Sequence, residues 1–167
     1  MKRAKWISTG MAFLLILIDQ CTKQWAIRTL SDGTRIQVIP NLFYLSYVEN
    51  RGAAFGIMQG NTNLLSLITG VLMLGALVLV YSGKLQSVPL TYTVMLILSG
   101  GLGNLIDRLS RGFVVDYLDF SALFNFPVFN FADCCVVVGT LLLLILVLRM
   151  DAERQGTAAP REPGEDS

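Results

Sequence analysis

The sequence of 167 residues contains no histidine and few charged residues, and both absences narrow what the protein can do. Without an imidazole, Ser–His and Cys–His nucleophilic pairs, histidine zinc sites and histidine-ligated haem are excluded. Charged residues make up 15% of the chain, against about 25% in an ordinary soluble domain, whereas 53% are hydrophobic. A soluble protein of this size cannot cover so much apolar surface, so the composition predicts an integral membrane protein. The formal net charge of +1 gives no attraction for nucleic acid.

Four segments are candidates for helices that cross a bilayer, which requires about 20 mostly apolar residues. No charged residue occurs from 52 to 83 or from 85 to 106. A signal peptide is the alternative for the first segment, but Asp19-Gln20 stands where small residues should precede a cleavage site. We therefore expect a retained first helix that runs through Asp19 and Lys23. The predicted helices cover residues 6–27, 64–81, 88–106 and 129–148.

The segments between these helices predict one membrane domain, residues 1–150, with both termini in the cytoplasm. The orientation follows from the basic cluster Lys2, Arg3 and Lys5 ahead of the first helix. Residues 29–56 form a long outer loop, in which residues 36–48 mix β-branched and aromatic residues and predict a short strand pair on the membrane surface. The fold class is thus all-α, with four transmembrane helices and a small extracytoplasmic β-strand segment. Residues 151–167, rich in Pro, Gly and charge, predict a disordered cytoplasmic tail.

Ionisable residues at membrane depth are costly and require an explanation. Asp19 and Lys23 lie four residues apart on one helical face, with the acid first, which is the favourable order for a pair. The pair either neutralises itself as a structural feature or positions a substrate. Both interpretations stay open at this point.

The end of the third helix carries small and polar residues on a single face. Gly100, Gly103, Asn104, Asp107 and Arg108 share it by their spacing of three and four residues. Small residues allow helices to approach closely in lipid, so packing explains the glycines. Asn104 and Arg108 would direct hydrogen-bond donors toward whatever that face meets.

Two further aspartates follow, at membrane-edge positions. Asp116 lies in an apolar run within a second predicted outer loop, residues 109–128. Asp133 lies in the first turn of the fourth helix, where Asn130 is a candidate N-cap. Helix capping is one interpretation of Asp133. The other is a pair of carboxylates, in which one draws a proton from water and the other protonates a departing amine. We expect Asp133 to be ionised at the helix N-terminus and Asp116, among apolar neighbours, to hold the shared proton.

Five sequence blocks, in this order, resemble the motif set of bacterial lipoprotein signal peptidases (signal peptidase II): Asp19-Gln20-Cys21-Thr22-Lys23, Asn50-Arg51-Gly52-Ala53-Ala54-Phe55, Gly100-Gly101-Leu102-Gly103-Asn104-Leu105-Ile106-Asp107-Arg108, Val114-Val115-Asp116-Tyr117 and Phe129-Asn130-Phe131-Ala132-Asp133. The resemblance covers residues 6–148. It implies a four-helix intramembrane aspartyl peptidase of the bacterial cytoplasmic (inner) membrane, with its active site near the outer face. We expect it to be a monomer. Such an enzyme removes the signal peptide of diacylglyceryl-modified prolipoproteins just before the lipidated cysteine.

The resemblance also assigns residues. Asp116 and Asp133 match the catalytic pair, and no cofactor or metal is implied. The positions that match the family's substrate pocket are Asp19, Lys23, Asn50, Gly52, Asn104, Arg108, Asn130 and Ala132. Membrane lipids and prolipoproteins are the expected partners.

Two other functions remain as alternatives to a peptidase. Intramembrane carboxylates also serve as relays in proton- or ion-coupled transporters, although four short helices without an internal repeat argue against one. A non-catalytic membrane subunit is the second alternative. Proton flux in proteoliposomes would favour the transporter, and full activity of Asn variants at Asp116 and Asp133 would favour the subunit.

Overall fold

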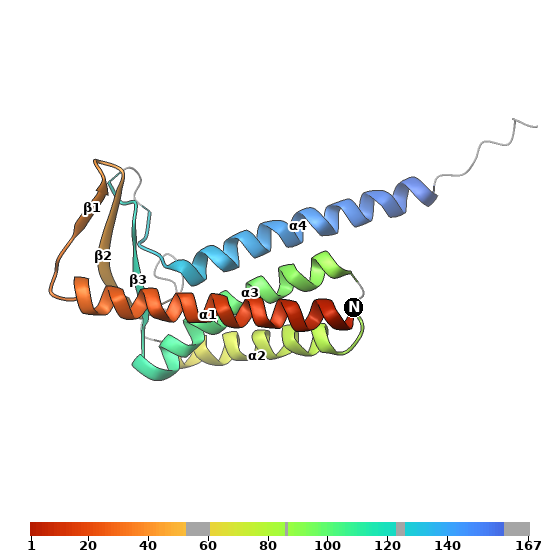
Figure 1. The fold of residues 1–167 in the computed structure, drawn as a ribbon, viewed down its shortest axis with the longest axis horizontal. Helices are drawn as coiled ribbons and strands as arrows, with labels where there is room; N and C mark the ends of the chain where they lie inside the picture. The colour runs from red at the N-terminus through yellow and green to blue at the C-terminus, as the bar shows by residue number, and fades with distance from the viewer. Residues whose placement is uncertain (53–60, 86, 123–125, 159–167) are drawn as a thin grey trace, which may run out of the picture.

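A computed structural model of the chain describes residues 1–52, 61–85, 87–122 and 126–158 (Figure 1). Within this part, four helices are long and apolar enough to cross a membrane, and three strands form a small antiparallel sheet. The predicted fold class is therefore confirmed. In chain order the elements are α1 (Lys2–Leu30), β1 (Ile36–Ile39), β2 (Phe43–Asn50), α2 (Thr62–Tyr81), α3 (Val88–Arg111), β3 (Val114–Asp119) and α4 (Phe131–Ala158).

Helix α3 is the centre of the bundle and packs against each of the other three helices. Glycines allow the close contact between α3 and α4. A Cβ atom on Gly100 would collide with the carbonyl oxygen of Ala132, and one on Gly139 would lie 2.6 Å from Ile97. The outer faces of α1, α2 and α4 instead carry exposed Leu, Ile and Val side chains, which suits contact with lipid.

The sheet lies across the end of the bundle where α1 and α3 end and α4 begins (Figure 1). The strand order is β1-β2-β3 with antiparallel pairing throughout, so the predicted strand pair is confirmed. Strand β3 was not predicted, because residues 109–128 had been expected to form a loop. Val115 and Tyr117 of β3 pack in one buried cluster with Ala26 and Leu30 of α1, which fixes the sheet to the helices.

Several helix ends differ from those predicted. Helix α1 begins at Lys2 and ends at Leu30, and α3 continues to Arg111, where Gly112 with φ 80° ends it. Helix α4 begins at Phe131 and continues to Ala158, so residues 151–158, expected in the disordered tail, are helical. This stretch contains good helix formers such as Ala and Glu, and charge alone does not end a helix. Residues 159–167 lie outside the described residues.

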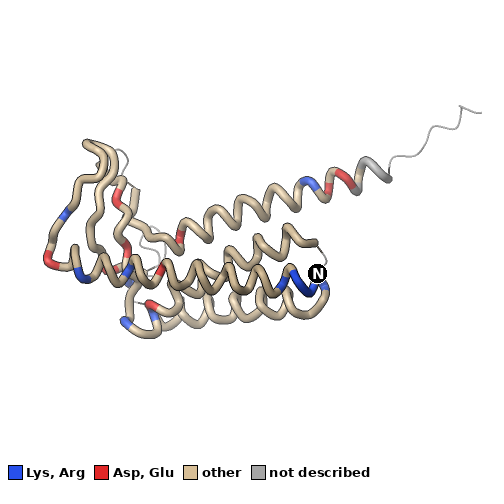
Figure 2. The backbone as a smooth tube through the Cα atoms, in the orientation of Figure 1, with Lys and Arg blue, Asp and Glu red and all other residues tan. Residues whose placement is uncertain are grey.

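Charged residues gather toward the two ends of the bundle, and the helices between are mostly uncharged (Figure 2). One charged group lies at the start of α1, at the end of the bundle opposite the sheet (Figure 2). It consists of Lys2, Arg3 and Lys5. The other lies beneath the sheet and contains the aspartates discussed next.

Candidate active site

A cavity of about 940 Å³ opens beside the sheet and contains both aspartates singled out by the sequence. Strands β2 and β3, helices α3 and α4 and the segment before α4 line it. Its apolar lining comes from residues 126–129 before α4, from valines of α4 at 136–138, and from Val48 and Val114 of the sheet. In the part of the chain that the structure describes, no group of three or more Cys, Asp or Glu side chains is placed to hold a metal ion. The polar residues of the lining are Glu49, Asn50, Arg51, Asn104, Arg108, Asp116, Asp133 and Cys134.

Asp116 projects from strand β3, where Asp116 pairs with Val48 of β2, and not from a loop. Its side chain is buried, with the residue 1% exposed. Two side-chain amides donate to it: Asn50 Nδ2 to Oδ2 at 2.9 Å and Asn130 Nδ2 to Oδ1 at 2.6 Å. Burial raises the pKa of Asp116 to about 7, and the nearby charge of Asp133 adds to the increase.

Asp133 lies in the first turn of α4 and uses its two carboxylate oxygens differently. Oδ2 accepts a hydrogen bond from the backbone N–H of Asn130 at 3.1 Å, while the backbone N–H of Asp133 donates to Asn130 Oδ1 at 3.0 Å. This reciprocal arrangement is a capping box. Oδ1 accepts from Asn104 Nδ2 at 2.7 Å. Helix capping and membership of the polar site are therefore compatible, and the N-cap predicted for Asn130 is confirmed.

Asn130 joins the two aspartates. Because its Oδ1 accepts from the backbone of Asp133, its amino group must point the other way, toward Asp116 Oδ1 and Asn104 Oδ1. The residue is fully buried. The side-chain amide of Asn130 thus connects the start of α4, which carries Asp133, to strand β3, which carries Asp116.

Asp19 and Lys23 form the ion pair expected from their spacing, with Lys23 Nζ 3.0 Å from Asp19 Oδ2. Both side chains are buried, and neither residue lines the cavity. Lys23 also donates to Asn104 Oδ1 at 2.9 Å, and Asp19 Oδ1 accepts from the backbone N–H of Ala132 at 3.0 Å. The pair lies behind the cavity wall, and these contacts favour the structural interpretation over direct contact with substrate.

Lys23 has a second carboxylate partner that the sequence did not predict as part of the site. Asp107 Oδ2 lies 3.0 Å from Lys23 Nζ, and Asp107 is fully buried. The one sequence feature that could have assigned Asp107 to the site was its position on the same helical face as Asn104. That spacing defines a face of α3, but it does not show that α1 places a lysine against it.

Arg108 reaches from α3 to the loop after β2. Its Nη2 donates to the carbonyl oxygen of Gly52 at 3.3 Å, and the backbone N–H of Gly52 donates to Asn50 Oδ1 at 3.0 Å. Among the described residues, Arg108 Nε is buried without a hydrogen-bond partner. The residue itself lines the cavity. Residues 53–55 of the same sequence block lie outside the described residues.

Gly103 gives a test of the packing behind the site. A Cβ atom there would collide with Asp19 Oδ2 and lie 3.3 Å from Ala132 Cβ, whereas one on Gly75 of α2 would meet nothing within 4 Å. Because Lys23 and Ala132 hold the Asp19 carboxylate, it cannot move aside. We expect Gly103→Ala to lower stability by about 1–3 kcal/mol relative to Gly75→Ala, measured by thermal unfolding in detergent. Equal stability of the two variants would contradict the tight packing.

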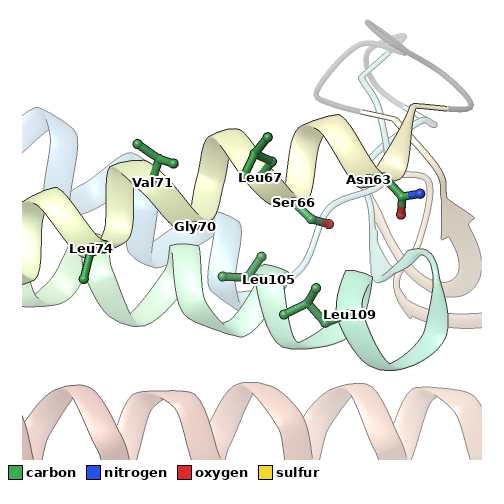
Figure 3. Close-up of a pocket in the computed structure, with 8 residues that line it drawn as sticks. All are labelled: Asn63, Ser66, Leu67, Gly70, Val71, Leu74, Leu105 and Leu109. Atoms are coloured by element: carbon green, nitrogen blue, oxygen red, sulfur yellow. The ribbon is translucent and has the colours of Figure 1, made fainter.

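A second cavity, of about 430 Å³, lies between α2 and α3 (Figure 3). Leu105 and Leu109 of α3 face the α2 side chains across it (Figure 3). Asn63 and Ser66 are its polar residues, and no ionisable side chain lines it. It therefore offers no acid or base, and the cavity beside the sheet is the candidate active site.

Fold and site together define a multi-span membrane protein in which polar and acidic side chains from α1, β2, α3, β3 and the start of α4 meet at one end of the helix bundle. The sequence profile described as signal peptidase (SPase) II matches residues 11–149. The chain belongs to this family of membrane peptidases.

Individual relatives agree with this assignment. Lipoprotein signal peptidases of Clostridium novyi (strain NT) and Clostridioides difficile (strain 630) are each 44% identical to the chain, over 136 and 146 residues. The alignments cover 80% and 84% of this chain and 92% and 93% of the relatives. A solved structure described as a bacterial membrane enzyme at 2.3 Å resolution is similar with a TM-score of 0.79 and 28% identity, covering 95% of this chain and 94% of that one. Another, at 1.9 Å, has a TM-score of 0.77 and 30% identity, covering 85% and 92%.

Proposed function

We propose that the chain cleaves diacylglyceryl-modified prolipoproteins just before the lipidated cysteine, using Asp116 and Asp133 to activate water. The observation that carries the mechanism is the placement of these two carboxylates on one cavity, joined through Asn130. The substrate class is supported by the relatives, which are named lipoprotein signal peptidases. A cavity with an apolar wall on a membrane-spanning helix also suits a lipidated substrate.

The two aspartates have different roles in the proposed reaction. Asp133, ionised at the N-terminus of α4, takes a proton from water as the oxygen attacks the scissile carbonyl carbon. Asp116, whose raised pKa of about 7 allows it to carry a proton near neutral pH, gives that proton to the amide nitrogen as the C–N bond breaks. The products are a carboxylic acid and an amine, and the proton then passes from Asp133 back to Asp116.

Arg108 and the asparagines orient the reacting groups. Arg108 lines the cavity, and its guanidinium can donate to a carbonyl oxygen of the substrate. Asn50 and Asn130 donate to Asp116, and Asn104 donates to Asp133, which leaves their amides as supports for the carboxylates. One chain supplies all of these residues, which supports a monomer as the active unit within the lipid bilayer.

We infer that the site lies at the outer face of the bacterial cytoplasmic membrane, with both termini in the cytoplasm. The basic start of α1 lies at the opposite end of the bundle from the sheet and the site (Figures 1 and 2). Basic residues near helix ends favour the cytoplasmic side, and this supports the orientation.

The orientation predicts the outcome of reporter fusions. A reporter that is active only outside the cytoplasm should work when fused after Arg35 or Ser121, which flank the sheet segments. It should fail after Lys84 or at the C-terminus. Activity in cells, normalised to the amount of fusion protein, is the measurement. The reverse pattern would place both aspartates in the cytoplasm and contradict the proposed site of cleavage.

A cleavage assay with matched substrates tests the proposed function. Purified protein is incubated with one prolipoprotein in its diacylglyceryl-modified and unmodified forms, and mass spectrometry maps the cut. We expect cleavage of the modified form alone, directly before the lipidated cysteine. Equal cleavage of both forms, or a cut elsewhere, would contradict the substrate class. Absence of cleavage together with proton flux in proteoliposomes would favour a transporter.

A further inference from the structure

Asp107 is a buried carboxylate that the proposed mechanism does not use. It lies on α3, is fully buried and does not line the cavity. Four donors from three elements converge on it. Oδ2 accepts from Lys23 Nζ of α1 at 3.0 Å and from the backbone N–H of Val115 of β3 at 3.1 Å. Oδ1 accepts from Gln20 Nε2 at 3.3 Å and from Arg111 Nη1.

The contact with Val115 ties Asp107 to one of the two proposed catalytic residues. Val115 immediately precedes Asp116 on β3 and is itself fully buried. Since its N–H donates to a side chain on α3, the strand is held from that side as well as by its pairing with β2. The position of the Asp116 backbone therefore depends on where the Asp107 carboxylate lies.

The contact with Lys23 connects Asp107 to Asp133, the other proposed catalytic residue. An ammonium group can only donate, so the Asn104 atom that meets Lys23 Nζ at 2.9 Å must be Oδ1. The amino group of Asn104 consequently points toward Asp133, where Nδ2 lies 2.7 Å from Oδ1. Lys23, held between Asp19 and Asp107, thus sets the direction of the donor that Asp133 receives, together with Asn130, whose amino group donates to the same Asn104 Oδ1.

We propose that Asp107 is a positioning residue that fixes the relative placement of Asp116 and Asp133, through Val115 on one side and through Lys23 and Asn104 on the other. This inference rests on the proposed use of these two aspartates in catalysis. A structural role limited to neutralising Lys23 and Arg111 would need the charge of Asp107, but not the exact length of its side chain.

Charge and geometry can be separated with two substitutions. Asp107→Asn removes the charge but keeps an oxygen that can accept one hydrogen bond. Asp107→Glu keeps the charge but cannot hold the same distances to both Val115 and Lys23. Asp119→Asn is the matched control. Asp119 is a buried carboxylate on β3, the strand that also carries Asp116. It forms an ion pair with Arg35 and accepts a hydrogen bond from Ser46, and not from either proposed catalytic residue.

The measurements are kcat, KM and the pH dependence of cleavage in protein shown to be folded by thermal unfolding. We expect both Asp107 variants to lose about 10- to 100-fold in kcat, with KM close to wild type, because the reacting groups are misplaced while the cavity lining is intact. Asp119→Asn should behave as wild type. Wild-type kcat in both Asp107 variants, or an equal loss in Asp119→Asn, would overturn the proposal.

The pH profile distinguishes misplacement from a smaller folded fraction. The charged and titratable groups around Asp107 are Asp19 and Lys23 of α1, Tyr47 of β2, Arg108 and Arg111 of α3, Asp116 of β3 and Asp133 of α4. Without the negative charge, Lys23 favours ionised Asp116, so the alkaline limb of activity should move to lower pH in Asp107→Asn by a few tenths to about one unit. It should stay near the wild-type position in Asp107→Glu.

Arg111→Gln tests the positioning role of Asp107 if neither Asp107 variant folds. Arg111→Gln removes a partly exposed partner and leaves the contacts of Asp107 with Val115 and Lys23 in place. Because those contacts remain, it should keep kcat near wild type. A loss as large as that expected for the Asp107 variants would show that charge in this cluster, and not the contacts with Val115 and Lys23, sets activity, and would overturn the proposal. Cleavage by Asp116→Asn or Asp133→Asn would instead refute the proposed catalytic use of these two aspartates. Loss of cleavage in both of them, beside wild-type behaviour at Asp107, would refute the positioning role alone.

Discussion

Prolipoprotein cleavage should fall by at least about 100- to 10,000-fold when either Asp116 or Asp133 is replaced by Asn, since the amide can neither take up nor release the proton that each carboxyl transfers. The geometry should survive in both variants. Asn at 133 keeps an oxygen for the capping contact with Asn130, and Asn at 116 keeps an oxygen for one of its two amide donors. The rate of cleavage of a lipidated prolipoprotein by purified protein is the measurement.

Folding controls accompany this prediction. Both variants should insert into the membrane, because Asn costs less there than an ion. Asp119→Asn, on the same strand as Asp116 but without a contact to the pair, should cleave normally. Cleavage that survives either substitution in the pair would refute the proposed mechanism.

Arg108→Lys should lower kcat/KM by about 10- to 100-fold while leaving insertion and stability unchanged. The lysine retains a positive charge near the end of α3, where either cation suits the helix dipole. It cannot reproduce the arginine's planar set of donors, of which Nη2 donates to the carbonyl oxygen of Gly52. The loss should therefore follow from hydrogen-bond geometry and not from charge.

The control for this prediction is Arg35→Lys. Arg35 contacts the Tyr44 ring and Asp119 on the sheet and does not line the cavity, so its replacement should leave cleavage near wild type. Wild-type turnover by Arg108→Lys would reduce Arg108 to a charge at a helix end.

The helices could be predicted from the sequence because their signal is local. Long charge-free runs mark α2 and α3, and the apolar stretches that continue through Asp19 and begin near Asp133 mark α1 and α4. Strand β3 could not be predicted in the same way. Its pairing partner, β2, lies far away in the sequence, and six residues after a helix resemble a loop until that partner is known.

The candidate site likewise contains residues that local sequence identifies and residues that only the tertiary structure identifies. Asp116, Asp133 and Asn130 could be singled out from residue type and position, and the structure brings them together. The partners that orient them come from other elements: Asn50 from β2, and Lys23 from α1 acting through Asn104. Asp107 was missed for this reason, because its role is defined by Val115 and Lys23, which no helical spacing on α3 reveals.

The location of the shared proton tests the account most directly. Infrared spectra of the carboxyl band, recorded from pH 5 to pH 9 for the protein in bilayers, compare wild type with the two Asn variants. Because the two titrations are coupled, the variants are needed to assign the band. The raised pKa of Asp116, about 7, predicts a protonated-carboxyl band in wild type that is lost as the pH rises through that region. The band should be absent from Asp116→Asn and present in Asp133→Asn. A band that persists in Asp116→Asn and disappears in Asp133→Asn would place the proton on Asp133 and contradict the assigned roles.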